Sequence, residues 1–308
     1  MTKPGNPTVS LDHVSRWYGN VVAVNDITFD FQPGVTGLLG PNGAGKSTIL
    51  HLLAGFLRPS AGAVRVLGRP AWGDPRLFRR VGLVPESEAV YGFLSARAFA
   101  VASARLQGLP DPQAAATRAI AWVGLEADQD RPMKGYSKGM RQRAKIAAAL
   151  VHDPQVLILD EPFNGTDPRQ RLQLMALLRE MAAEGRTIIF SSHILEEVER
   201  LADEVLVILA GQLAASGDFQ VIRRLMTDRP HSFSLLTTDD RRVASLLIGR
   251  PEVRAVTVAE EGLEVHTTDY AAFTACVAPV IRDAGVTLLQ LRPSDESLES
   301  VFSYLVRR

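Results

Sequence analysis

The stretch Gly40-Pro41-Asn42-Gly43-Ala44-Gly45-Lys46-Ser47-Thr48 decides the fold of this chain. It fits the pattern G-x-x-x-x-G-K-[ST], in which glycines let consecutive backbone N–H groups turn inward around a polyphosphate. The apolar run Val35–Leu39 precedes it and predicts a strand. After it, Ile49, Leu53 and Phe56 recur at helical spacing. A strand, a loop and a helix in this order distinguish a phosphate-binding loop from an ordinary Gly-rich turn, so we predict nucleotide binding.

Two side chains in this stretch are predicted to carry chemistry. Lys46 is expected to reach the β- and γ-phosphates, and the Ser47 hydroxyl is expected to ligate Mg²⁺. The N-terminus of the following helix adds about half a positive charge facing the phosphates. The whole stretch from Gly40 to Thr48 is therefore our candidate ATP-binding loop.

Composition narrows the classes of protein that remain. A chain of 308 residues accommodates one large domain or two unequal ones. Its 34 basic and 34 acidic residues give zero formal net charge, so no overall basic surface favours nucleic acid as a partner. The single cysteine, Cys276, excludes an internal disulfide framework and fits a reducing compartment. Met1–Asp12 lacks the apolar core of a signal peptide, and no apolar run approaches the ~18 residues of a membrane span. Any membrane role is therefore expected to come through a partner subunit.

The region from residue 1 to about 217 alternates strand-like and helix-like segments, which is typical of an α/β domain. Continuous apolar runs predict strands buried on both faces of a mainly parallel sheet: Val35–Leu39, Val81–Val84, Val156–Leu159, Thr187–Phe190 and Val205–Leu209. Val9–Val14 and Ile27–Phe31 predict a small antiparallel layer. The Ala-rich stretch of about residues 93–151 lacks a convincing strand and predicts a helical subdomain.

The C-terminal part of the chain shows a different order of predicted strands and helices. A polar, turn-prone passage from Gly211 to His231 marks a boundary, and we expect residues 218–231 to form a linker. Beyond it, residues 232–308 predict a ferredoxin-like α+β domain of order β-α-β-β-α-β, followed by a last helix. The predicted segments are strand Ser232–Leu236, helix Arg241–Leu247, strands Ala255–Val258 and Leu263–His266, helix Tyr270–Ala284, strand Thr287–Leu291 and helix Glu296–Leu305.

A second informative site is the apolar strand Val156–Leu159, which ends in the adjacent carboxylates Asp160 and Glu161. Asp160 can hold Mg²⁺ beside the phosphate loop, directly or through water. Glu161 can orient or deprotonate an attacking water. Alone, such a strand tip is more often a solvated acidic turn; its occurrence after a phosphate loop favours the catalytic interpretation.

A third site is the stretch Tyr136-Ser137-Lys138-Gly139-Met140-Arg141-Gln142-Arg143, which opens a predicted helix running to Val151. Ser137 is a plausible N-cap, and the exposed N–H groups of Ser137, Lys138 and Gly139 make an anion site. The residues from Gly135 to Gly139 also match the G-x-S-x-G pattern of serine hydrolases. That motif needs a strand leading into the serine, and the polar segment Asp128–Lys134 cannot supply one, so we reject it.

These motifs together resemble an ABC ATPase. Five occur in order: the phosphate loop, the Ser-x-Gly helix, the acidic strand tip, Gly165-Thr166-Asp167-Pro168 and Ser191-Ser192-His193. The resemblance covers about Val9 to Gly217 and implies a P-loop NTPase core in a head-to-tail dimer that holds two ATP molecules with Mg²⁺. It further implies that Ser137 and Gly139 contact the γ-phosphate of the partner's ATP, that His193 senses the γ-phosphate and that Asp167 links the two sites. Tyr18 falls where the family stacks an aromatic ring on adenine.

The chain departs from the family pattern at three positions. Lys138 replaces a glycine of the signature motif, which adds positive charge beside an intact Ser137 and Gly139. Thr166 replaces the usual leucine before Asp167. Glu86 follows Pro85 where the family commonly has glutamine; either side chain offers an oxygen to Mg²⁺ or to water, but glutamate adds a full negative charge.

The same variants resemble the ATP-binding subunits of bacterial drug and antibiotic exporters. This resemblance implies a separate integral membrane permease at the cytoplasmic face of the cell membrane, an ATPase partner that is either identical or a paralogue, and a contact surface after Glu86. Its candidate residues are Val90, Tyr91, Phe93 and Leu94. An importer subunit and a soluble, non-transport ABC ATPase remain as alternatives.

Overall fold

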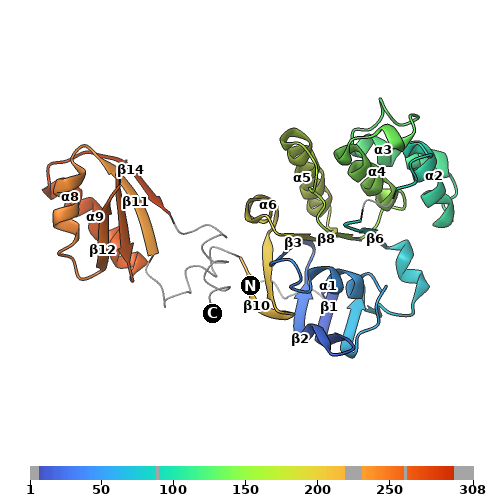
Figure 1. Ribbon diagram of the computed structural model, residues 1–308, viewed down its shortest axis with the longest axis horizontal. Helices are drawn as coiled ribbons and strands as arrows, with labels where there is room; N and C mark the ends of the chain where they lie inside the picture. The colour runs from blue at the N-terminus through green and yellow to red at the C-terminus, as the bar shows by residue number, and fades with distance from the viewer. Residues whose placement is uncertain (1–6, 88–89, 219–230, 260–261, 295–308) are drawn as a thin grey trace. The chain divides into compact units, whose positions relative to one another are not determined.

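The computed structural model describes residues 7–87, 90–218, 231–259 and 262–294. The chain divides into two compact units, Met1–Ser216 and Gly217–Arg308 (Figure 1). In the first unit, the described residues form a six-stranded sheet, a four-stranded sheet and the helices that cover them; in the second they form one four-stranded sheet with two helices.

The six-stranded sheet confirms the predicted parallel core. Its strands lie in the order β10-β9-β3-β8-β7-β6. They are β3 (Gly34–Leu39), β6 (Val81–Val84), β7 (Val156–Leu159), β8 (Thr187–Ser192), β9 (Glu204–Leu209) and β10 (Gln212–Gly217). All pairings among β3, β6, β7, β8 and β9 are parallel, and every residue of β7 and β8 is buried. Strand β10 was missed by the sequence analysis because its exposed and half-buried residues alternate without an apolar run.

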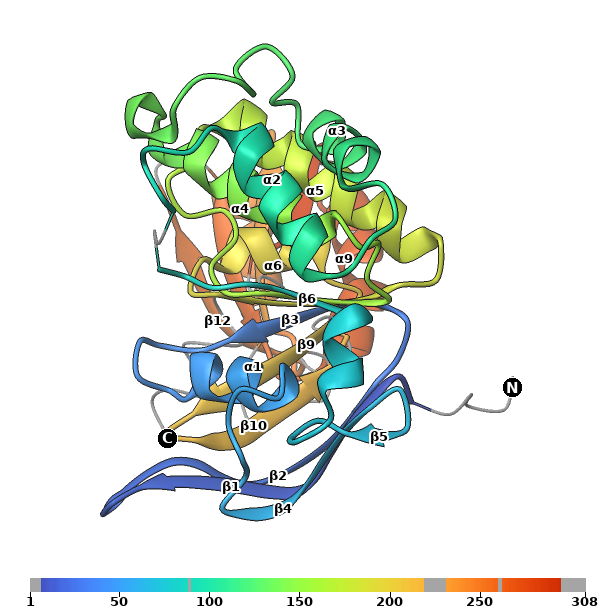
Figure 2. The same ribbon diagram turned by 90° about the vertical axis from the view of Figure 1, so that its right-hand side faces the viewer.

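The second sheet contains the two strands of the predicted antiparallel layer, which are longer than expected, and two strands that were not predicted, β4 and β5. Its order is β2-β1-β4-β5, formed by β1 (Val9–Tyr18), β2 (Val21–Phe31), β4 (Ala61–Val66) and β5 (Arg69–Pro70). β1 and β2 continue to the hairpin pair Tyr18–Val21, beyond the apolar residues that defined the prediction, because backbone pairing persists where the side chains are exposed. Figure 2 shows α1 (Lys46–Leu53) between this layer and the six-stranded sheet.

Helices α4 (Lys138–Leu150), α5 (Pro168–Ala183) and α6 (Leu195–Leu201) cover the other face of the six-stranded sheet (Figure 2). The region predicted as a helical subdomain contains α2 (Ala96–Leu106), α3 (Pro112–Trp122) and α4 (Lys138–Leu150), and its described residues hold no strand beyond the isolated bridge Ser95–Pro132. The remaining helices are α5 (Pro168–Ala183), α6 (Leu195–Leu201) and the short 3₁₀ helices η1 (Pro75–Arg79) and η2 (Met133–Gly135). The first turns of α2, α3 and α4 are capped by the side chains of Ser95, Asp111 and Ser137.

The C-terminal unit confirms the ferredoxin-like prediction. Its elements follow the order β11 (His231–Thr237), α8 (Asp240–Leu247), β12 (Val253–Val258), β13 (Leu263–Thr267), α9 (Tyr270–Asp283) and β14 (Leu288–Pro293). The strands form an antiparallel sheet of order β12-β13-β11-β14. The predicted linker ended at residue 231, whereas β11 already begins at His231. The rest of that linker, 219–230, and the predicted helix Glu296–Leu305 lie outside the described residues.

Candidate active site

The phosphate-binding loop joins β3 to α1, which confirms the predicted strand, loop and helix, although α1 ends at Leu53 and Phe56 lies beyond it. Two of its glycines are required by close backbone contacts. A Cβ atom on Gly40 would lie 2.3 Å from the carbonyl oxygen of Ile208, and one on Gly45 would lie 2.3 Å from that of Ala23. Gly45 also precedes the helix with φ of 103°, a conformation that other residues rarely adopt. The loop can therefore keep this tight turn only with glycine at both positions.

The loop forms one wall of a pocket of about 450 Å³ that collects most of the predicted site residues. The lining residues come from β2, the phosphate loop and the start of α1, the loop after β6, the segment after β7 and the segment after β8. They are Ala23, Asn42, Gly43, Gly45, Lys46, Ser47, Thr48, Glu86, Asp160, Glu161, Asn164 and His193. Segments more than a hundred positions apart in the sequence thus meet at the carboxyl ends of parallel strands, where α/β folds place their ligands.

The ammonium group of Lys46 lies against the carbonyl groups of its own loop. Its Nζ donates hydrogen bonds to the carbonyl oxygens of Gly40, at 2.7 Å, and Pro41, at 3.2 Å. Burial lowers the pKa of Lys46 from its ordinary value. The carboxylates of Glu161, Asp160 and Glu86 act in the opposite direction on this pKa, in that order of strength. A polyphosphate would therefore meet a partly desolvated cation that needs only to exchange carbonyl partners for phosphate oxygens.

Asp160 and Glu161 are both buried, and one hydroxyl group fixes them relative to each other. Ser191 Oγ donates to Asp160 Oδ1 at 2.5 Å and accepts from the backbone N–H of Glu161 at 2.9 Å. The sequence analysis used His193 from the Ser191-Ser192-His193 run and missed this role of Ser191. A signal was present, since a hydroxyl at the end of a buried apolar strand needs a hydrogen-bond partner.

His193 lies beside the carboxylate predicted to activate water. Its Nδ1 is 2.9 Å from Glu161 Oε2, while about half of the imidazole is exposed towards the pocket. Glu161 itself has φ of 48°, an unusual conformation for a side chain that is not glycine. The backbone thus leaves the extended conformation at the residue whose carboxylate contacts His193.

The donor chemistry of the pocket fits a hard divalent cation. Glu86, Asp160 and Glu161 bring three carboxylates, against the single ammonium of Lys46. Such an acidic pocket would repel a bare polyphosphate, whereas a cation shared between carboxylate, hydroxyl and phosphate oxygens removes the repulsion. The hydroxyl of Ser47 and the oxygens of Asp160 and Glu86 are donors of the kind that Mg²⁺ prefers.

The predicted signature residues are absent from the lining of this pocket. Ser137 Oγ accepts from the backbone N–H of Met140 at 3.2 Å and so caps α4. Lys138 Nζ donates to Asn164 Oδ1 at 3.2 Å, and a Cβ atom on Gly139 would lie 2.5 Å from Gln170 Oε1. These contacts place the start of α4 beside the turn that leads into α5.

Asp167 and Tyr18 also lie apart from the pocket lining. Asp167 caps α5, with its Oδ1 accepting from the backbone N–H of Gln170 at 2.8 Å. Tyr18 ends β1 with a half-exposed ring, and the guanidinium carbon of Arg16 lies 4.7 Å from the ring centroid. The structure thus gives Asp167 a local capping role and leaves Tyr18 accessible, so the inter-subunit role of Asp167 and the adenine-stacking role of Tyr18 stay predictions.

Comparison with known proteins decides the family. The family model for ABC transporters matches residues 24–164. The chain is 30% identical over 303 residues to the uncharacterized ABC transporter ATP-binding protein YxlF of Bacillus subtilis, covering 97% of this chain and 99% of that protein. The chain belongs to the ABC transporter ATP-binding subunits.

Two further relatives support this ABC subunit assignment. The Nod factor export ATP-binding protein I of Rhizobium meliloti strain 1021 is 34% identical over 321 residues, covering 99% of this chain and 90% of that protein. The solved structure of cbiO1 from Clostridium perfringens, described as part of the ABC transporter complex cbiONQ, matches with a TM-score of 0.65 at 28% identity, over 72% of this chain and 92% of that one.

As an ABC ATPase, the subunit binds and hydrolyses ATP. Among the residues described, no helix of the subunit is long and apolar enough to cross a membrane.

Proposed function

We propose that this ABC ATP-binding subunit works in a head-to-tail dimer at the cytoplasmic face of the cell membrane. The dimer drives a separate membrane permease, and the direction of transport is export. One observation carries the dimer: Ser137, Lys138 and Gly139 form a capped helix start outside the chain's own phosphate pocket. An N-terminal anion site that faces no phosphate in its own chain is suited to a nucleotide held by a second copy or by a paralogue.

In this proposal the phosphate loop and Lys46 bind the triphosphate. Lys46 exchanges the carbonyls of Gly40 and Pro41 for phosphate oxygens, and its ammonium opposes the charge that spreads over the γ-phosphate oxygens during transfer. Mg²⁺, held by Ser47, Asp160 and Glu86, supplies neutralisation of phosphate charge when bound. Tyr18 stacks on the adenine ring.

Glu161 and His193 act on the attacking water and the γ-phosphate. Glu161 orients the water in line with the bond that breaks and takes its proton. His193 is hydrogen-bonded to Glu161 through Nδ1, and the exposed part of its imidazole ring contacts the γ-phosphate. The γ-phosphate is contacted by both subunits. Once it is cleaved, these shared contacts are lost and the dimer opens.

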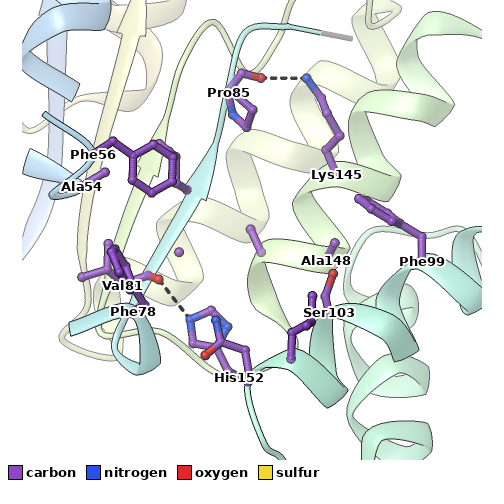
Figure 3. Close-up of a pocket in the computed structure, with 15 residues that line it drawn as sticks. Ala54, Phe56, Phe78, Val81, Pro85, Phe99, Ser103, Lys145, Ala148 and His152 are labelled. Atoms are coloured by element: carbon purple, nitrogen blue, oxygen red, sulfur yellow. Dashed lines mark hydrogen bonds between the residues drawn. The ribbon is translucent and has the colours of Figure 1, made fainter. Parts of the chain in front are cut away.

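A groove of about 390 Å³ is the proposed docking site of the permease (Figure 3). Phe56 and Phe78 form one side, from the segments after α1 and in η1, and Phe99 on α2 forms the other. An apolar groove between two subdomains suits a short amphipathic helix. Near the loop after Glu86, Tyr91 is 61% exposed and Phe93 is 78% exposed, so both remain available to a partner.

The direction of transport rests on relatives and not on a feature of the ATPase site. A relative is named for export of Nod factor, and the chain resembles the subunits of drug exporters. Because one ATPase mechanism serves both directions, reconstitution with its permease would decide between export and import by the side on which substrate accumulates.

The dimer is tested with Glu161→Gln, which keeps the shape of the site but removes the base. We expect this variant to retain ATP and to elute as a dimer in size-exclusion chromatography with ATP and Mg²⁺, while turnover falls by about a hundredfold or more. Glu180→Gln, an exposed change on α5, is the control and should behave as the unmodified chain. Elution of the Glu161 variant as a monomer only, at ATP concentrations that saturate binding, would rule out the proposed dimer.

A further inference from the structure

The loop after β6 lies between the apolar groove and the phosphate pocket. Pro85 lines the groove of about 390 Å³, and the next residue, Glu86, lines the phosphate pocket of about 450 Å³. Glu86 is exposed, and the proposed function makes it a ligand of the cation at the phosphates. Something must therefore hold this short loop in place if Glu86 is to face the phosphates reproducibly.

Lys145 on α4 holds the backbone of this loop. Its Nζ donates to the carbonyl oxygens of Pro85 at 2.7 Å and Ser87 at 2.8 Å, and it lies 3.5 Å from that of Glu86. An ammonium group has three donors, and three successive carbonyls surround this one. Figure 3 shows the side chain of Lys145 reaching from α4 to the Pro85 carbonyl across the end of the groove.

The burial of Lys145 indicates that these bonds matter energetically. The residue is only 6% exposed, and lysine is rarely buried unless its charge has partners. The hydrogen bonds from the ammonium to the loop carbonyls replace hydration that it loses on burial, and so help to make a lysine tolerable at this position. The same bonds in turn fix the loop to α4, the helix that begins with the signature residues.

We propose that Lys145 is a positioning residue for Glu86: it fixes the Pro85–Ser87 backbone to α4 and thereby sets where the Glu86 carboxylate lies in the phosphate pocket. The inference rests on the proposed role of Glu86 and adds the residue that acts through it. Lys145 does not line the phosphate pocket, so its effect on the site is expected to pass through the loop that carries Glu86.

The test is a double-mutant cycle on ATP turnover by the full chain. Lys145→Met removes the ammonium but keeps the length of the side chain. We expect kcat to fall about tenfold while KM for ATP changes less than twofold, because Lys46 and the phosphate loop still bind the nucleotide. In a Glu86→Ala background the same change should cost less than twofold, since the carboxylate it positions is gone. Lys145→Arg, which keeps charge and donors, should restore at least half of the turnover.

Two controls separate positioning from a general structural role. Lys134→Met makes the same exchange at an exposed lysine and should leave kcat unchanged. Thermal unfolding shows whether each variant is folded; if Lys145→Met does not fold, Lys145→Gln, which keeps one donor group, replaces it in the cycle. A loss in kcat of the same size with and without Glu86, or no loss at all, would overturn the inference. An unmodified chain without ATPase activity would instead remove the proposed function of the site.

Discussion

Ser191 donates a 2.5 Å hydrogen bond to Asp160, and through the same hydroxyl oxygen it accepts one from the backbone of Glu161. The residue proposed to hold the cation and the residue proposed to activate water are thereby fixed by one atom from the neighbouring strand. Ser191 is completely buried, so no water can replace the hydroxyl without rearrangement.

We therefore expect Ser191→Ala to damage both stability and turnover. A hydrogen bond to a charged group contributes about 1.5–3 kcal/mol, and its loss leaves buried polar atoms without a partner. Turnover should fall about tenfold, and the Mg²⁺ concentration for half-maximal activity should rise. ATPase assays over a Mg²⁺ titration and thermal unfolding measure both effects. Ser245→Ala, which removes an exposed hydroxyl on α8, is the control; turnover within twofold of the unmodified chain in the Ser191 variant would contradict the expectation.

Glu86→Gln is expected to be mild. The amide keeps an oxygen for Mg²⁺ or water and removes one of the three carboxylates that crowd the pocket. ATP affinity should stay within twofold and hydrolysis should change by less than tenfold, as measured by nucleotide titration and phosphate release. Complete loss of turnover in this variant would show that the negative charge itself is required.

The permease surface is tested at Tyr91 and Phe93. Replacing each with aspartate exchanges an exposed aromatic ring for a negative charge. The core is not disturbed, so basal ATPase activity should persist. Stimulation of the ATPase by the reconstituted permease should fall at least fivefold. Leu246→Asp, at an exposed apolar residue of α8 outside the proposed contact surface, should retain full stimulation. Normal stimulation in both Tyr91→Asp and Phe93→Asp would remove these residues from the proposed contact surface.

Cys276 should react slowly with thiol reagents in the folded protein. Burial, aided by the side chain of Glu252, raises the pKa of the Cys276 thiol from 9.0 to about 11. Because the thiolate is the reactive form, its fraction at pH 8 falls by about a hundredfold relative to an ordinary thiol. As the only cysteine, it gives a clean readout with a chromogenic disulfide reagent, in buffer and in urea.

Glu252→Gln is the matching variant. The Glu252 carboxylate is the second cause, after burial, of the raised pKa of the Cys276 thiol. Its removal should lower that pKa, so Cys276 in the folded protein should react with the thiol reagent several times faster. Equal rates for folded and unfolded chain would contradict the high pKa.

The candidate site was predictable to the extent that its parts are local in sequence. The phosphate loop, the strand ending in Asp160 and Glu161, and the capped helix at Ser137 each show their character within about ten residues, because spacing and burial periodicity are properties of short segments. The ferredoxin-like order of the tail followed from the same periodicity. Strands β4, β5 and β10 were not predicted, because backbone pairing, and not an apolar run, makes them strands.

The sequence by itself therefore determined the family and the fold class, and it predicted which residues would hold phosphate and magnesium. Only the tertiary structure decided that Ser191 joins Asp160 across 31 positions, that Lys145 reaches Pro85 across 60, and that Ser137 stays outside the pocket of its own chain. The physical reason is that a hydrogen bond between distant segments leaves no periodic trace in either of them. It exists because the parallel sheet and the helix packed on it bring their ends together.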